Sequence, residues 1–194
     1  MSKTNAELKA IMRDYNKTFR DLSNAEYNEK LLSLKPGENA PTKGKLTGTR
    51  RERMENKAAE CRSKVADILN REMTEVNKKL TAAPSTEAVN TITLFNMRDS
   101  KSITPEMINT LLDEYGDNVQ SYEAIKDIAK QKGFNLDFNG VMHPLREQQA
   151  NIEALNRSLN SSLNIYNSER VVNTPGYEAF LEMSIDNTFA PDPE

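Results

Sequence analysis

The chain has 194 residues, of which 37% are hydrophobic, and it contains no Trp and a single Cys. That length suits one domain with extended helical arms, and so polar a composition favours long helices with narrow apolar stripes over a thick globule. One Cys excludes an internal disulfide and an all-cysteine metal site. No run of residues approaches the roughly 20 apolar residues of a membrane span, and the polar N-terminus does not resemble a signal peptide. We therefore expect a soluble protein that is cytoplasmic in the producing cell.

The net charge of −3 conceals an uneven distribution. Residues 1–100 hold 19 Lys and Arg against 14 Asp and Glu, whereas residues 101–194 hold 7 against 15. A chain polarised in this way can meet partners of opposite sign with its two halves, or pair with copies of itself. Ordinary solvated helix faces are the alternative interpretation.

Residues 4–34 are predicted to form a first helix. Its apolar residues recur in steps of three and four, which is the period of a helix face: Leu8, Met12, Tyr15, Phe19 and Leu22. The dipeptide Pro36-Gly37 ends the helix. Residues 35–48 contain Pro, Gly and Lys without periodicity, so a flexible basic linker is predicted there.

Residues 49–82 give the clearest helix, with Thr49 as a candidate N-cap. One apolar stripe runs along it with a mean step of about 3.7 residues, which indicates a nearly straight helix. The stripe consists of Met54, Ala58, Cys61, Val65, Leu69, Met73, Val76 and Leu80. Pro84 ends the helix.

Residues 86–142 are predicted to form a smaller helical lobe. A helix is favoured over a strand at 86–98, and a helix at 104–115 begins with the N-cap Thr104 and Pro105. Asp117 with Gln120 forms a capping-box pattern that opens another helix, and Gly133 ends it. Asn139-Gly140 after alternating apolar residues is compatible with a short β-hairpin.

Pro144 opens a long helix that is predicted to reach about Val172. Leu145, Ile152, Leu159 and Tyr166 repeat every seven residues along it, which is the spacing of a coiled-coil seam. A short helix over 177–185 and a Pro-rich tail complete the chain. The fold prediction is thus all-α, with an elongated long-helix bundle or coiled-coil-like arms, a smaller helical lobe and the hairpin as an open alternative.

The sequence offers little for catalysis. The only His, His143, is interpreted as an exposed residue at a helix start, and Cys61 lies within an apolar stripe. A zinc site needs three or four Cys, His or carboxylate ligands, so no metal and no cofactor are expected. The chain is predicted not to be an enzyme, and only a carboxylate-based hydrolase without a locatable site stays open.

Two groups of residues are candidate binding surfaces. A basic loop could contact phosphates or an acidic partner, although without aromatic residues it is not suited to stacking on bases; a solvated loop is the alternative. This loop comprises Lys43, Lys45, Arg50, Arg51 and Arg53. The long helices are expected to self-associate or to bind a protein partner through their stripes, because one chain of this size is expected to be too small to cover them; an intramolecular antiparallel bundle is the rival. The candidate interface residues are Met54, Cys61, Val65, Leu69, Val76, Leu145, Ile152 and Leu159.

The stretch Leu111–Gly133, LLDEYGDNVQSYEAIKDIAKQKG, together with the Asn- and Lys-rich long helices, resembles helical head-morphogenesis proteins of tailed bacteriophages. The resemblance implies a scaffolding or auxiliary capsid protein, located in the virion or in the producing cell. The acidic C-terminal end departs from the basic capsid-binding helix that such scaffolds often carry. The function predicted is therefore a non-enzymatic structural, assembly or interaction protein. The alternative is a nucleic-acid-binding accessory protein that uses residues 35–53.

Overall fold

The computed structural model describes residues 3–134, 143–171 and 176–189. Within these ranges the chain is 79% helical, with eight α-helices, one short 3-10 helix and no strand. The prediction of an all-α fold is therefore confirmed. The hairpin alternative falls on residues 135–142, which lie outside the described residues.

The chain divides into two compact units. The first comprises Met1–Glu72 and Asn151–Glu194, and the second comprises Met73–Ala150. The second unit includes the 86–142 segment that was expected to form the smaller lobe. Two helices, α2 (Gly48–Leu80) and α6 (Pro144–Ser162), contribute residues to both units.

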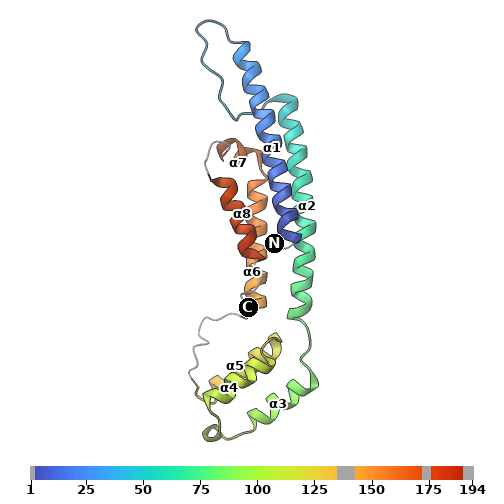
Figure 1. Ribbon diagram of the computed structural model, residues 1–194, viewed down its shortest axis with the longest axis vertical. Coiled ribbons are helices and arrows are strands. Elements are labelled where there is room, and N and C mark those ends of the chain that lie inside the picture. Colours follow the sequence, from blue (N-terminus) through green and yellow to red (C-terminus); the bar gives the residue numbers. More distant parts are fainter. Residues whose placement is uncertain (1–2, 135–142, 172–175, 190–194) are drawn as a thin grey trace. The chain divides into compact units, whose positions relative to one another are not determined.

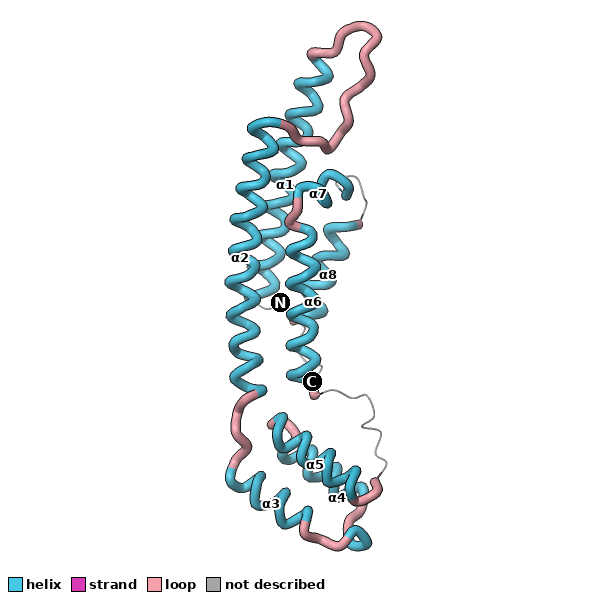
Figure 2. Tube along the Cα trace, turned by 180° about the vertical axis from the view of Figure 1, so that it is seen from behind, coloured by secondary structure: helices cyan, strands magenta, loops and turns pink. Residues whose placement is uncertain are grey.

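The first unit is a helix bundle. Figures 1 and 2 show α1 (Lys3–Leu32), α2, α6 and α8 (Tyr177–Thr188) running alongside one another, with the short helix α7 (Ile165–Val171) near the start of α8. The apolar stripes identified in the sequence meet in the centre of this bundle, where burial supplies the main stabilisation. The largest fully buried side chains there are Leu8, Tyr15, Leu46, Met54, Leu69, Ile152, Leu159, Leu163, Leu181 and Ile185.

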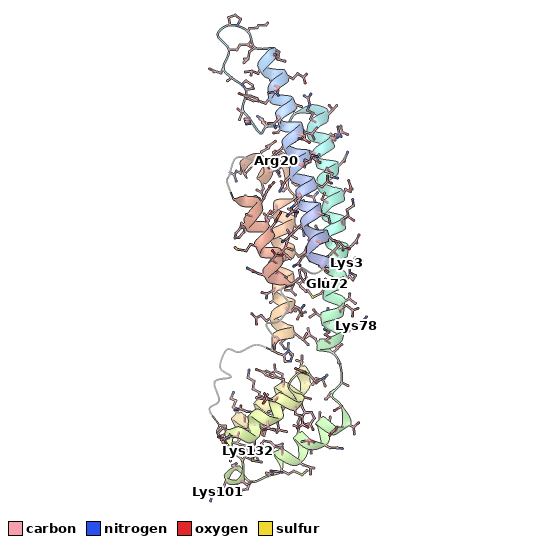
Figure 3. The ribbon with its side chains drawn as sticks, viewed as in Figure 1. Lys3, Arg20, Glu72, Lys78, Lys101 and Lys132 are labelled. Atoms are coloured by element: carbon pink, nitrogen blue, oxygen red, sulfur yellow. The ribbon has the colours of Figure 1, made fainter. Side chains whose placement is uncertain are left out.

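Ion pairs join α1 to α8 along the side of the bundle. Lys9 Nζ lies 2.6 Å from Asp186 Oδ2, and Arg13 Nε lies 2.6 Å from Glu182 Oε1. Arg20, labelled in Figure 3, extends the series with a 2.7 Å contact to Glu178. Because rising numbers on α1 pair with falling numbers on α8, the two helices are antiparallel. The acidic side chains of α8 therefore form ion pairs within the chain itself.

The prediction of a single helix from Pro144 to about Val172 is wrong, because this segment forms two helices, α6 and α7. Leu163 and Ile165 are both buried, yet side chains two positions apart do not face the same way on a continuous helix. The break lets both enter the core. Polar groups satisfy the exposed backbone: Arg62 Nη1 donates to Leu163 O at 2.9 Å, and Asn164 Oδ1 accepts from Tyr166 N at 2.9 Å.

The second unit is built from α3 (Thr86–Asn96), a 3-10 helix (Ser100–Ser102), α4 (Pro105–Tyr115) and α5 (Val119–Gln131). Three sequence predictions are confirmed here: a helix rather than a strand at α3, the Thr104 cap with Pro105 at the start of α4, and Gly133 as the stop after α5 with a φ of 82°. The core of this unit consists of Ile92, Phe95, Ile103, Ile108, Leu111, Ile125, Ile128 and Ala129.

The cap of α5 differs from the sequence prediction. Asn118, not Asp117, is the N-cap, and its Oδ1 accepts from Gln120 N and Ser121 N at 3.1 Å each. Its Nδ2 also donates to Ala82 O at 2.9 Å. An amide side chain can accept and donate at once, so Asn118 both caps α5 and fastens the segment between α2 and α3.

His143 is buried, contrary to the expectation of an exposed residue at a helix start. Its Nδ1 accepts from Leu145 N at 3.2 Å, and its Nε2 lies 3.1 Å from Gly116 O. Because a carbonyl only accepts, the hydrogen sits on Nε2 and the ring is the neutral tautomer. The ring also meets Tyr122 edge-on at 5.2 Å. His143 is therefore a structural cap for the start of α6.

Candidate interaction surfaces

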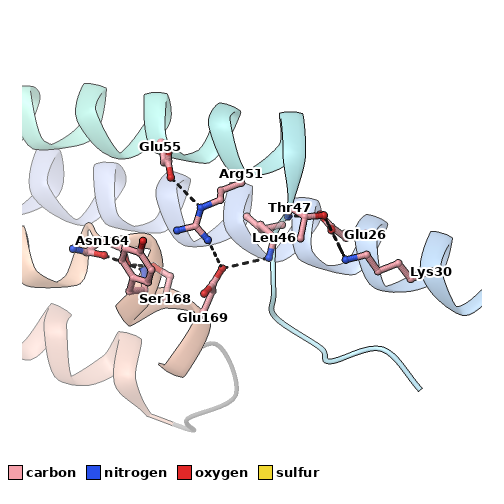
Figure 4. Close-up of polar contacts among 10 residues, drawn as sticks. Glu26, Lys30, Leu46, Thr47, Arg51, Glu55, Asn164, Ser168 and Glu169 are labelled. Carbon is pink, nitrogen blue, oxygen red and sulfur yellow. Dashed lines mark hydrogen bonds and ion pairs between the residues drawn. The ribbon is translucent and has the colours of Figure 1, made fainter. Parts of the chain in front are cut away.

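The linker between α1 and α2 is not wholly flexible, because its C-terminal end is fixed to the bundle (Figure 4). Leu46 is only 1% exposed. Thr47 donates to Glu26 through both its backbone N, at 3.0 Å, and its hydroxyl. The helix that follows begins at Gly48, so Thr49 lies inside it and is not its cap. These contacts hold one end of the basic loop against α1.

Glu26 is the centre of this anchor. Burial opposes ionisation of its carboxyl group, but hydrogen bonds from Lys30 and Thr47 outweigh that effect and lower its pKa to about 2. The Lys30 ammonium lies 2.7 Å from Glu26 Oε1. A carboxylate that accepts several hydrogen bonds is stabilised in its charged form, so Glu26 holds the loop as an ion at neutral pH.

Two of the three predicted loop arginines are engaged within the first unit. Arg50 lies 2.5 Å from Glu29. Arg51 contacts Glu55 at 3.1 Å and Glu169 of α7 at 3.3 Å, and its guanidinium stacks 4.9 Å from the centre of the Tyr166 ring. Since these groups already have partners, Arg50 and Arg51 secure the α2 and α7 termini more than they offer charge to a ligand.

The other members of the basic loop face solvent. Lys43, Lys45 and Arg53 are exposed and make no ion pair with any residue in the described ranges. The structure therefore reduces the predicted five-residue basic surface to three available cations.

The predicted helix interface lies inside the chain. Met54, Cys61, Val65, Leu69, Val76, Ile152 and Leu159 are each at most 4% exposed, and Leu145 is half-buried. The premise that one chain could not cover these stripes is wrong, because all of these residues except Leu145 are buried within the chain as the structure describes it. The antiparallel bundle that was kept as the rival is what the structure shows. Any self-association must use other residues.

The two residues weighed for catalysis are both buried. Burial raises the pKa of the Cys61 thiol, with smaller effects from neighbouring charges, so the reactive thiolate is disfavoured. In the described part of the chain no group of three or more His, Cys, Asp or Glu side chains could hold a metal ion. Among the same residues no helix is both long and apolar enough to cross a membrane.

An open apolar groove lies in the second unit, between α3 and α4. Its volume is about 300 Å³. It forms because α3 and α4 each pack mainly against α5 and leave a furrow between themselves. The groove is lined by Thr91, Leu94, Phe95 and Arg98 from the α3 side and by Met107, Thr110 and Leu111 from α4.

Exposed apolar side chains that are not part of the core lie at and near the groove. Leu94 is 65% exposed at its edge, and nearby Met97 is 76% exposed. Arg98 is exposed at one end and makes no ion pair within the described residues. Lys132, labelled in Figure 3, fixes that end, since its Nζ donates to Asn96 O and Arg98 O at 2.9 Å each. An apolar furrow whose rim carries a cation with no ion-pair partner among the described residues is suited to bind an amphipathic helix.

Sequence reasoning missed this groove, although a pattern for it was present. The α3 segment carries Val89, Ile92, Leu94, Phe95 and Met97, which is more than one helix face of apolar residues. Ile92 and Phe95 account for the core. The surplus apolar residues indicate a second face that contacts something else.

Comparisons with known proteins identify no relative. No family model, no curated protein and no solved structure matches this chain.

Proposed function

We propose that this chain is a non-enzymatic interaction protein that assembles with another protein by docking a helix into the α3–α4 groove. The observation that supports this most is the groove itself, which combines about 300 Å³ of open space with exposed Leu94 and with Arg98, which has no ion-pair partner among the described residues. Exposed apolar patches of this kind usually mark protein contacts. The bundle of the first unit acts as a rigid, self-contained framework, because its stripes are already buried.

Site-specific photo-crosslinking in the producing cell tests the docking function. A photoreactive amino acid at position 94 should give a discrete crosslinked species, and mass spectrometry should identify it. The matched control is position 93, because Thr93 is exposed on the same helix but outside the groove lining. Equal or absent crosslinking at the two positions would overturn the proposal.

The biological setting that we propose is phage capsid assembly, on the resemblance of Leu111–Gly133 to head-morphogenesis proteins. Much of that stretch forms α5 and the end of α4, which contribute Leu111, Ile125, Ile128 and Ala129 to the core on which the groove helices pack. Removing the gene from a phage that encodes it should leave genome replication intact and reduce the yield of filled heads. Unchanged head yield would contradict this setting without touching the docking function.

The second candidate is nucleic-acid binding by the basic loop, which the exposure of Lys43, Lys45 and Arg53 favours. Three phosphate contacts would make the logarithm of affinity for duplex DNA fall with the logarithm of salt with a slope of about −2.7. The triple variant Lys43→Glu, Lys45→Glu, Arg53→Glu should abolish such binding. Lys79→Glu, an exposed residue at the end of α2, is the control. Absence of binding in low salt excludes this candidate.

A further inference from the structure

The outer face of α8 is apolar although the bundle does not use it. Leu181 and Ile185 point into the core and are 2% and 0% exposed. Phe180 and Met183 are 55% and 54% exposed. Their spacing of three residues places them on one side of the helix, about one turn apart. The helix therefore presents two large apolar side chains to solvent in the i, i+3 pattern of a helix that docks into a groove.

The charge of α8 suits the α3–α4 groove. The helix contains three acidic residues and no Lys or Arg. Asp186, Glu178 and Glu182 pair with α1, yet their side chains stay 49%, 43% and 28% exposed. Asp186 follows Met183 by three positions, so α8 carries a half-exposed carboxylate one turn from the Met183 anchor, within reach of a cation such as Arg98 at the groove rim.

The other exposed apolar helix end fits the groove less well. Leu31 and Leu32 at the end of α1 are 44% and 89% exposed, but Lys30 and Lys35 flank them. Lys30 already pairs with Glu26, but Lys35 forms no ion pair among the described residues and would meet the like charge of Arg98, which disfavours docking. Of the α1 end and α8, the acidic α8 is the segment whose charge is opposite to that of Arg98.

We propose that the occupant of the α3–α4 groove is α8 of a second copy of this chain, with Phe180 and Met183 as the apolar anchors. This inference rests on the proposed function, since it names the partner of the same groove. The two surfaces that meet are different patches of one chain, so the contact is heterologous. Such contacts repeat from copy to copy and build rings or filaments, which is the behaviour expected of an assembly protein.

Complementation between two full-length variants tests the inference by light scattering over a wide concentration range. Leu94→Glu spoils the groove and leaves α8 intact, whereas Met183→Glu spoils α8 and leaves the groove intact. The native chain should grow in mass with concentration beyond a dimer. Each variant alone should stay monomeric, with its self-affinity reduced at least ten-fold. An equimolar mixture should form a dimer and nothing larger, because only one competent groove and one competent α8 are available.

Leu32→Glu is the matched control. It also replaces an exposed leucine with a charge, so it should leave self-association unchanged if the loss in the other variants comes from the contact itself. Circular dichroism of every variant should match the native chain, since all of the substituted side chains are at least half exposed.

The outcomes separate this inference from the proposed function. A native chain that is monomeric at all concentrations, or a mixture of variants that does not dimerise, overturns the inference. If position 94 then crosslinks to a different protein, the docking function survives with another partner. A crosslink from position 94 to α8 of the same molecule, shown by an unchanged mass, also overturns the inference.

Discussion

At the scale of single residues, the chain places buried or partly buried polar groups where helices begin or where a loop meets the bundle. Glu26, Asn118 and His143 each satisfy backbone groups that would otherwise be unpaired. An unpaired buried polar group costs more free energy than a made hydrogen bond contributes. These three residues therefore hold connections in place, and substitutions there test local energetics separately from the two cores.

Glu26→Gln should destabilise the first unit in a pH-dependent way. The pKa of Glu26 is lowered to about 2 from its ordinary value of 4.5, so its charge contributes stability above about pH 4.5 that is lost as the pH falls toward 2. The variant should lose about 1–3 kcal/mol of unfolding free energy at pH 7. Urea denaturation at pH 7 and pH 3 should show the gap shrinking at the lower pH. Glu52→Gln, an exposed carboxylate, should show no gap, and a pH-independent gap for Glu26→Gln would contradict the electrostatic account.

Asn118 offers two substitutions that separate its two roles. Asn118→Ala removes both the cap of α5 and the bond to Ala82 O, and should cost about 1–2 kcal/mol. Asn118→Asp keeps a cap acceptor but loses the donor, so it should cost clearly less. Thermal unfolding of both variants measures the difference. Equal losses for the two variants would show that the Ala82 contact, and not the cap, carries the stabilisation.

At the scale of elements, the spacing of apolar residues along the sequence predicted the positions of the helices well. Stripe spacing in α1 and α2 reflects which residues enter the core, so Leu8, Tyr15, Val65 and Leu69 were identified and are all buried. Caps proved less reliable by one residue, as at Asn118, because neighbouring Asp and Asn residues have nearly equal preferences for that position. The break between α6 and α7 was missed because the seven-residue repeat continues through it.

The candidate binding surfaces depend on tertiary contacts, which the spacing of apolar residues along the sequence does not reveal. Charge in the basic loop was visible in the sequence, but the partners of Arg50 and Arg51 come from α1 and α7, which are distant in the chain. The same holds for Leu94, whose exposure depends on how α3 and α4 pack on α5. An apolar stripe in the sequence indicates that a helix face is buried. Only the packing in the structure shows which element covers that face.

Val65→Asp should unfold the first unit and not dissociate an oligomer. Val65 is 0% exposed at the centre of α2, and an unpaired carboxylate there is far costlier to bury than a methyl group is to lose. We expect a loss of more than about 4 kcal/mol, enough to remove much of a typical domain's stability. Circular dichroism measures it. Ser63→Asp, exposed two residues earlier, should keep native helicity. A folded Val65→Asp monomer would show that the stripe is an interface after all.

At the scale of the whole molecule, the opposite charges of the two halves of the sequence partly neutralise each other through ion pairs inside the first unit. The basic side chains of α1 pair with the acidic side chains of α8 at three levels. The two halves of the sequence therefore attract each other within one chain before they attract a partner. Exposed pairs of this kind add little stability individually, but together they fix the antiparallel orientation of α8 and so its outward apolar face.

The division into two units predicts that each core unfolds on its own. Ile125 is 0% exposed in the second core, and Leu159 is 0% exposed in the first. Truncating either to Ala leaves a cavity and should cost about 2–5 kcal/mol. Because Ile125 lies in the core of the second unit, Ile125→Ala should weaken α3, α4 and α5 while α1 and α8 keep their stability.

Hydrogen exchange measured by mass spectrometry resolves this element by element. Ile125→Ala should accelerate exchange in α3–α5 and in the last turns of α2, which belong to the second unit, and leave α1 and α8 at native rates. Leu159→Ala should do the reverse. The helices α2 and α6 are the decisive places, since each is continuous but divided between units. If either variant accelerates exchange uniformly along both helices and in both cores, the two units unfold as one, and the groove could not then be altered independently of the bundle.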